Sequence, residues 1–225
     1  MVSPSPAGYD AWDASDQYHA RFLLGPDAAL DFALSNSKKH GLPDIAVSAS
    51  QGKLLHLLVR SLGAKRIAEV GTLGGYSTIW FARAVGPEGK VVTFELQDKH
   101  AKVARENLEH AGVGDRVEIV VGPAANSLAA TEGNGTFDFA FVDADKESNV
   151  TYVKECKRLV KSGGVIIVDN VVRNGAVADE NNDHPSNVGV RALLKYLQDD
   201  QELEGTTVPT AGSKGFDGWM YLLRK

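Results

Sequence analysis

Cysteine is almost absent: the 225-residue chain contains Cys156 and no other cysteine. One cysteine excludes an internal disulfide and every cysteine-rich metal site. Long apolar runs are missing too, because no stretch approaches the roughly 18 residues that identify a transmembrane helix. Residues 1–16 lack the basic start and the apolar centre of a signal peptide. We therefore expect a soluble, cytoplasmic protein with no membrane partner.

An excess of basic residues is also missing. Lys and Arg together number 24 against 29 Asp and Glu, which gives a formal net charge of -5. A non-specific nucleic-acid binder needs a basic face to neutralise phosphates, and no dense Lys/Arg tract occurs here. We therefore expect no nucleic-acid partner. The length and composition fit a single domain over residues 1–225.

The N-terminal part of the sequence predicts a flexible start followed by helices. Residues 1–15 are expected to form a flexible arm, because prolines and a glycine interrupt its first half. A polar helical pattern then covers about residues 16–39. Ser48 and Gln51 have the spacing of a capping box ahead of a leucine-rich helix, and Gly63 is placed to end that helix.

From residue 65 onward, short apolar strands alternate with amphipathic helices. This alternation predicts a doubly wound α/β fold, in which helices cover both faces of a mostly parallel sheet. Ligands of such sheets bind beyond the carboxyl ends of the strands. Two final strands without an intervening helix suggest an antiparallel edge. The predicted strands are 66–70, 90–95, 116–121, 137–143, 165–169, 205–209 and 218–223, and the clearest helices are 76–85, 98–111 and 187–199.

A glycine-rich turn follows the first predicted strand, where residues 69–77 read EVGTLGGYS. Glycines there let a ligand approach the backbone, and Glu95 after the second strand is placed to bind both hydroxyls of a ribose. The turn is not a dinucleotide motif, because Leu73 occupies the middle glycine position. Glu69 would repel a pyrophosphate but suits an ammonium or sulfonium group. The pattern therefore favours S-adenosylmethionine over NAD, and a turn that needs glycine only for steric reasons is the alternative.

Acidic and amide side chains follow two later strands. Asp143 ends the fourth predicted strand and Asp145 follows it, while Asp169 and Asn170 close the fifth. Two carboxylates and an amide oxygen suit Mg²⁺ and leave positions for water and substrate oxygens. Strand-end acids also serve as caps and turn formers, but two such ends together favour a metal site. Lys146 lies among these acids, where it is either a general base or a simple ion-pair partner.

These residues and their neighbours match a known family. The chain resembles the cation-dependent class I O-methyltransferases, the group that contains the catechol and caffeoyl-CoA O-methyltransferases. The resemblance extends from about Val47 to the C-terminus. The segments that carry it are VSASQG (47–52), EVGTLGGYS (69–77), FVDADK (141–146), GGVIIVDN (163–170) and KGFDG (214–218).

The resemblance implies a seven-stranded Rossmann-like sheet, S-adenosylmethionine as methyl donor, and Mg²⁺ or another divalent cation such as Mn²⁺ or Ca²⁺. Family members are often homodimers, so we also expect a homodimer. Lys146 is the implied catalytic base, and the implied metal ligands are Asp143, Asp169 and Asn170. The implied substrate contacts are Asp143, Lys146 and Asn174, and the implied cofactor contacts are Val47, Glu69, Gly71, Thr72, Ser77, Glu95 (ribose), Ala124 (adenine), Asp143 and Asp145 (amino group).

The sequence departs from the family pattern at a few places. Position 145 is Asp, as in the caffeoyl-CoA and microbial branch, whereas the animal catechol enzymes have Trp there. Val47 replaces a Ser or Thr of plant relatives, so only its backbone is available for binding. Residues 173–187 and the arm before Asp16 match poorly, and these segments usually determine the choice of acceptor.

We therefore predict a Mg²⁺-dependent enzyme that methylates one hydroxyl of a vicinal-diol phenol of the catechol, caffeoyl or flavonoid type. Two adjacent substrate oxygens would complete the coordination of the metal. An NAD-dependent oxidoreductase is the first alternative, although it has no use for Asp143, Asp169 and Asn170. The second alternative is a non-catalytic S-adenosylmethionine-binding protein, which the intact candidate base and metal ligands disfavour.

Overall fold

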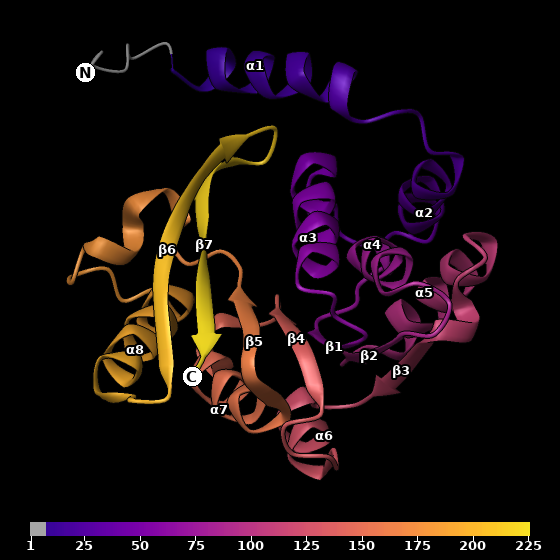
Figure 1. The fold of residues 1–225 in the computed structure, drawn as a ribbon. Coiled ribbons are helices and arrows are strands. Elements are labelled where there is room, and N and C mark those ends of the chain that lie inside the picture. Colours follow the sequence, from indigo (N-terminus) through magenta and orange to yellow (C-terminus); the bar gives the residue numbers. More distant parts are fainter. Residues whose placement is uncertain (1–7) are drawn as a thin grey trace.

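The computed structural model describes residues 8–225, which form one sheet with helices on both faces (Figure 1). The helices are α1 (Gly8–Leu23), α2 (Ala28–Lys39), α3 (Ala49–Ser61), α4 (Tyr76–Val85), α5 (Asp98–His110), α6 (Ala124–Ala130), α7 (Asn149–Leu159) and α8 (Pro185–Asp199). The strands are β1 (Arg66–Val70), β2 (Lys90–Glu95), β3 (Val117–Val121), β4 (Phe137–Val142), β5 (Val160–Val168), β6 (Leu203–Gly212) and β7 (Gly215–Arg224). Short 3-10 turns cover Gly114–Arg116, Lys146–Ser148 and Arg173–Ala178.

The seven strands lie in the order β3-β2-β1-β4-β5-β7-β6. Strands β1 to β5 are parallel, and β7 pairs antiparallel with β5 and β6. The predicted doubly wound, seven-stranded architecture with an antiparallel edge is thus confirmed. From β1 in the middle of the sheet, β2 and β3 are added towards one edge, whereas β4 and β5 are added towards the opposite edge. The point where the direction changes, between β1 and β4, is where such sheets bind ligands.

Alternate residues of the central strands enter two separate hydrophobic cores, because successive side chains of a strand point to opposite faces. On one face, Ile67 and Phe141 pack with residues of α2, α3, α4 and α5. On the other face, Ala68 and Val142 pack with residues of α6, α7 and α8, and fully buried Cys156 belongs to this core. Figure 1 shows the same two helical layers. With both faces covered, the edge formed by the strand ends is left for function.

The N-terminal prediction is wrong in part. Residues 1–7 of the expected flexible arm lie outside the described residues, but residues 8–15 belong to helix α1. The helix expected over about 16–39 is interrupted at 24–27, because Gly25 and Pro26 break the backbone pattern and Asp27 starts a new helix. The side chain of Asp27 accepts hydrogen bonds from the first-turn amides of α2. Among residues 8–225, no helix is long and apolar enough to cross a membrane.

Candidate functional site

The register of the sheet brings the predicted site residues to one edge. Val70 of β1 lies beside Val142 of β4, which in turn lies beside Val168 of β5. The next residue of each strand continues the ladder: the amide of Asp143 donates to the Val70 carbonyl at 2.8 Å, and the amide of Asp169 donates to the Val142 carbonyl at 2.9 Å. Backbone pairing therefore fixes the two aspartates side by side.

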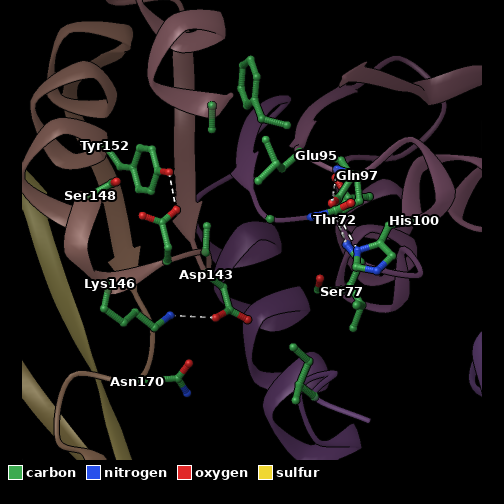
Figure 2. A pocket seen from close by; sticks show the side chains of 18 of the residues that line it. Thr72, Ser77, Glu95, Gln97, His100, Asp143, Lys146, Ser148, Tyr152 and Asn170 are labelled. Atoms are coloured by element: carbon green, nitrogen blue, oxygen red, sulfur yellow. Dashed lines mark hydrogen bonds and ion pairs between the residues drawn. The ribbon is translucent and has the colours of Figure 1, made fainter. Parts of the chain in front are cut away.

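A cavity of about 800 Å³ opens at this edge (Figure 2). Its wall comes from the turn after β1, the ends of β2, β4 and β5, and the segments that lead into α3 and α6. Three predicted residues, Glu69, Asp169 and Asn174, are not part of this wall. Ten predicted residues line it: Val47, Gly71, Thr72, Ser77, Glu95, Ala124, Asp143, Asp145, Lys146 and Asn170.

Glu69 lies behind the cavity wall, fully buried. Its two carboxylate oxygens accept hydrogen bonds from the Ser77 hydroxyl at 2.6 Å and the Thr78 hydroxyl at 2.5 Å. Burial raises the pKa of Glu69 to about 7, although these two hydrogen bonds oppose the shift. In this structure the carboxylate therefore holds Ser77, which does face the cavity.

Glu95 holds the glycine-rich turn in place. One carboxylate oxygen accepts hydrogen bonds from the backbone amides of Thr72 at 3.2 Å and Leu73 at 2.8 Å. The other accepts from the amide of Gln97 at 2.9 Å and lies 3.3 Å from Nδ1 of His100. The side chain remains at the cavity surface, so this buried anion links the turn after β1 to the start of α5 (Figure 2).

Asp143, Lys146 and Asp169 form the charged centre of the site. The Lys146 ammonium lies 3.0 Å from Oδ1 of Asp143, and the Lys146 side chain is almost completely buried. Burial and the nearby Asp143 carboxylate raise the pKa of Asp169 well above its usual range. The centre thus places two carboxylates together with one cation.

Gln51 of α3 also reaches this centre, which the sequence did not indicate. Its Nε2 donates a hydrogen bond to Oδ2 of Asp169 at 2.6 Å, while Oδ1 accepts from the Asn170 amide at 2.8 Å. The capping role predicted for Ser48 is confirmed, since its hydroxyl accepts from the Gln51 amide at 3.1 Å. The reciprocal side-chain bond of a capping box is replaced by the contact with Asp169.

The donor set at this centre fits a divalent cation with hard oxygen ligands. Two adjacent carboxylates in a buried site repel each other, and Lys146 compensates only one of them. Asn170, which follows directly and has a positive φ of 55°, lines the cavity and offers an amide oxygen. Residues 8–225 contain no group of three His, Cys, Asp or Glu side chains suited to a metal. The fit therefore depends on the amide as third ligand.

Asp145 lines the cavity on the side of α7. The Tyr152 hydroxyl donates a hydrogen bond to its carboxylate at 2.5 Å (Figure 2). Burial, followed by this bond to a carboxylate, raises the pKa of Tyr152 to about 12. Burial alone would raise the pKa of Asp145, but hydrogen bonds from Ser148 and Tyr152 hold it below its usual value. Asp145 is therefore a fixed anion at neutral pH.

The loop after β5 forms the remaining wall. Arg173 lines the cavity, whereas Asn174, the predicted substrate contact, is exposed and does not. Both have positive φ values, 52° and 55°. The loop is held by Asp217 of β7, whose Oδ1 accepts from the amides of Val172 at 3.0 Å and Arg173 at 2.8 Å.

Comparison with known proteins agrees with this geometry. The O-methyltransferase family matches residues 29–220. A catechol O-methyltransferase from Mycobacterium tuberculosis is 49% identical over 220 residues, which cover 98% of this chain and 96% of that protein. An O-methyltransferase from Bacillus cereus, solved in complex with SAH, superposes with a TM-score of 0.93 at 43% identity, over 96% of this chain and 99% of that one. An O-methyltransferase of tomaymycin synthesis from Streptomyces achromogenes, solved with SAM, gives a TM-score of 0.91 at 40% identity over 100% of both chains.

Proposed function

The chain belongs to the O-methyltransferase family, and from this we propose that it transfers a methyl group from S-adenosylmethionine to one hydroxyl of a vicinal-diol phenol with the help of Mg²⁺. Catechol, caffeoyl-type and flavonoid diols are the acceptor class. The observation that carries the proposal is that Asp143, Lys146 and Asn170 line one cavity at two adjacent strand ends, while Asp169 lies next to them outside the cavity wall. An NAD-dependent oxidoreductase would have no use for this group.

The cavity supports S-adenosylmethionine as the donor. The relatives solved with SAM and SAH share the fold over nearly the whole chain. Glu95 suits the ribose hydroxyls and Ala124 the adenine ring, while Asp145 suits the positively charged amino group. The methionine part would follow Gly71, Thr72 and Ser77, with Glu69 acting through Ser77.

The metal would be held by Asp143, Asp169 and Asn170. A divalent cation held there would supply positive charge beside two adjacent hydroxyls and would lower the pKa of the one that reacts. The two carboxylates would compensate that charge.

The reaction requires a base next to the acceptor hydroxyl. Lys146 acts as this base at Nζ once its ammonium group has given a proton to solvent, and the Asp143 carboxylate 3.0 Å away holds that nitrogen in place. The acceptor oxygen then bonds to the methyl carbon as the carbon–sulfur bond breaks. The bonding electron pair remains on sulfur, which becomes neutral. Holding both reactants in one cavity supplies much of the acceleration.

Replacing Asp169 by Ala tests the role of the metal independently of cofactor binding. Asp169→Ala should abolish methylation of catechol while S-adenosylmethionine still binds in calorimetry, because Asp169 lies outside the cavity wall that the cofactor would touch. Full turnover of this variant in the presence of EDTA would refute the metal mechanism. If the wild-type chain does not bind S-adenosylmethionine, the proposal as a whole is refuted.

We also propose that the chain forms a homodimer through helix α1. Trp12, Tyr18, Phe22 and Leu23 are exposed on this helix, although large apolar side chains on one element usually have a partner surface. Light scattering should give twice the monomer mass for the wild-type chain and the monomer mass for a Phe22→Ser, Leu23→Ser double variant. Leu62→Ser, an exposed leucine after α3, is the control. A cytoplasmic location remains a prediction.

A further inference from the structure

Arg173 is a cation in the cavity wall without a counter-charge. Its side chain is half-buried, and among residues 8–225 its guanidinium makes no hydrogen bond, ion pair or ring contact. The carboxylates of the same cavity are all engaged by other groups. Asp143 pairs with Lys146, Asp145 accepts from Tyr152, and Glu95 accepts from backbone amides. The Arg173 charge is therefore available to a ligand.

The backbone around Arg173 is fixed. Its φ of 52° lies in the left-handed region, which is uncommon for any residue other than glycine. The Arg173 amide donates to Oδ1 of Asp217 at 2.8 Å, so a neighbouring strand maintains this conformation. A strained residue held by surrounding structure is typical of ligand-binding sites. The loop thus presents Arg173 to the cavity.

The position of Arg173 assigns it to the acceptor side. It follows Asn170 by three residues, so their Cα atoms lie within about 11 Å of each other. Asn170 and Lys146 belong to the group that would hold and deprotonate the acceptor, whereas Glu95 and His100 lie across the cavity from them (Figure 2). A substituted benzene ring bound next to Asn170 therefore has Arg173 within reach of its substituents.

We propose that Arg173 binds a carboxylate carried by the acceptor, so that the enzyme prefers acidic vicinal diols to neutral ones. This inference rests on the proposed function and names the acceptor class more closely. A guanidinium binds a carboxylate through two parallel hydrogen bonds, and partial burial strengthens them. The same group would give a neutral catechol no comparable interaction.

The test compares two acceptors across three variants. In the wild-type chain and in Arg173→Met, Arg173→Lys and Arg105→Met, kcat and KM are measured for 3,4-dihydroxybenzoate and for catechol. Arg173→Met should lower kcat/KM for the acid about tenfold or more, mainly through KM. Its effect on catechol should stay within about twofold, and Arg173→Lys should retain part of the preference. Arg105 is exposed on α5 outside the cavity, so Arg105→Met controls for net charge.

Three results would overturn the inference. An equal loss on both acceptors would mean that Arg173 shapes the site without recognising charge. A weaker affinity for S-adenosylmethionine in calorimetry, with unchanged acceptor preference, would assign Arg173 to the carboxylate of the cofactor. Failure of the wild-type chain to methylate either acceptor would remove the proposed function and this inference together, whereas the first two results leave the proposed function intact.

Discussion

Gln51 should control the affinity of the site for a divalent cation. Its Nε2 donates to Oδ2 of Asp169 at 2.6 Å, and this is a side-chain contact between α3 and a predicted metal ligand 118 residues away. Gln51→Leu keeps most of the volume and removes the donor. Asp169 is almost fully buried, so its Oδ2 would be left without a hydrogen bond, and among residues 8–225 only the Asn170 amide at Oδ1 would still orient the carboxylate.

The expected loss of metal affinity can be estimated from other residues that hydrogen-bond a metal ligand without touching the metal. Partners that orient a ligating carboxylate change metal affinity by about 10- to 100-fold when they are removed, or about 1.4 to 2.7 kcal/mol. We expect a loss of this size in Gln51→Leu when Mn²⁺ binding is followed by electron paramagnetic resonance without acceptor. Ser50→Ala is the matched control, because the Ser50 hydroxyl donates to Asp16 at 2.8 Å and does not touch Asp169.

A measurement of thermal stability distinguishes a loss of Asp169 orientation from a loss of folding. Thermal unfolding by circular dichroism should show both variants folded at the temperature of the binding experiment. A folded Gln51→Leu that binds Mn²⁺ as tightly as the wild-type chain, or more tightly, would refute the reasoning.

Three further predictions follow from single residues. A Cβ on Gly71, whose φ is +99°, would lie 2.1 Å from the Asp143 carbonyl, so Gly71→Ala should lower the free energy of unfolding in urea by about 3 kcal/mol. Gly63→Ala, with a similar positive φ and open space around it, should lose only about 1 kcal/mol, and equal losses would contradict the steric account. Burial raises the pKa of Cys156 to about 12, so Ellman's reagent should label it only after unfolding, and rapid labelling of the native chain would be inconsistent with this. Burial alone would raise the pKa of Asp200, but hydrogen bonds from Lys157 and other donors lower it to about 2. Asp200 therefore stabilises the fold above about pH 4, and about 1 kcal/mol is lost as the pH falls towards 2. Asp200→Asn should flatten this part of the stability curve in urea titrations, whereas an unchanged slope would argue against the assignment.

The sheet and its main helices were predictable because their signals are local. Both β1 and β4 are almost entirely buried and consist mainly of apolar residues, and α4 begins and ends at the residues predicted from its pattern. Helix α6 was missed, since seven residues are too few to show a periodicity. The early start of β5 at Val160 was also missed, because Ser162, Gly163 and Gly164 resemble a turn in sequence.

The site was predictable to the extent that strand ends define it. Asp143 and Asp169 were placed together by the order of parallel strands, which the alternation of elements already implies. Gln51 and Arg173 were not found, because each reaches the site through contacts between distant segments that leave no local pattern. Glu69 was expected to touch the ligand, but the Ser77 and Thr78 hydroxyls of the following helix occupy its oxygens. The contact between Glu69 and these two hydroxyls depends on how α4 packs against β1, which the sequence pattern does not show.

The most direct test of the account is methyl transfer from S-adenosylmethionine to catechol by the wild-type chain, first with Mg²⁺ and then with excess EDTA. We predict a methylated product with Mg²⁺, none with EDTA, and recovery when Mg²⁺ is restored, because Asp143, Asp169 and Asn170 would then hold the cation beside Lys146. Undiminished product formation in EDTA would contradict the role assigned to these residues.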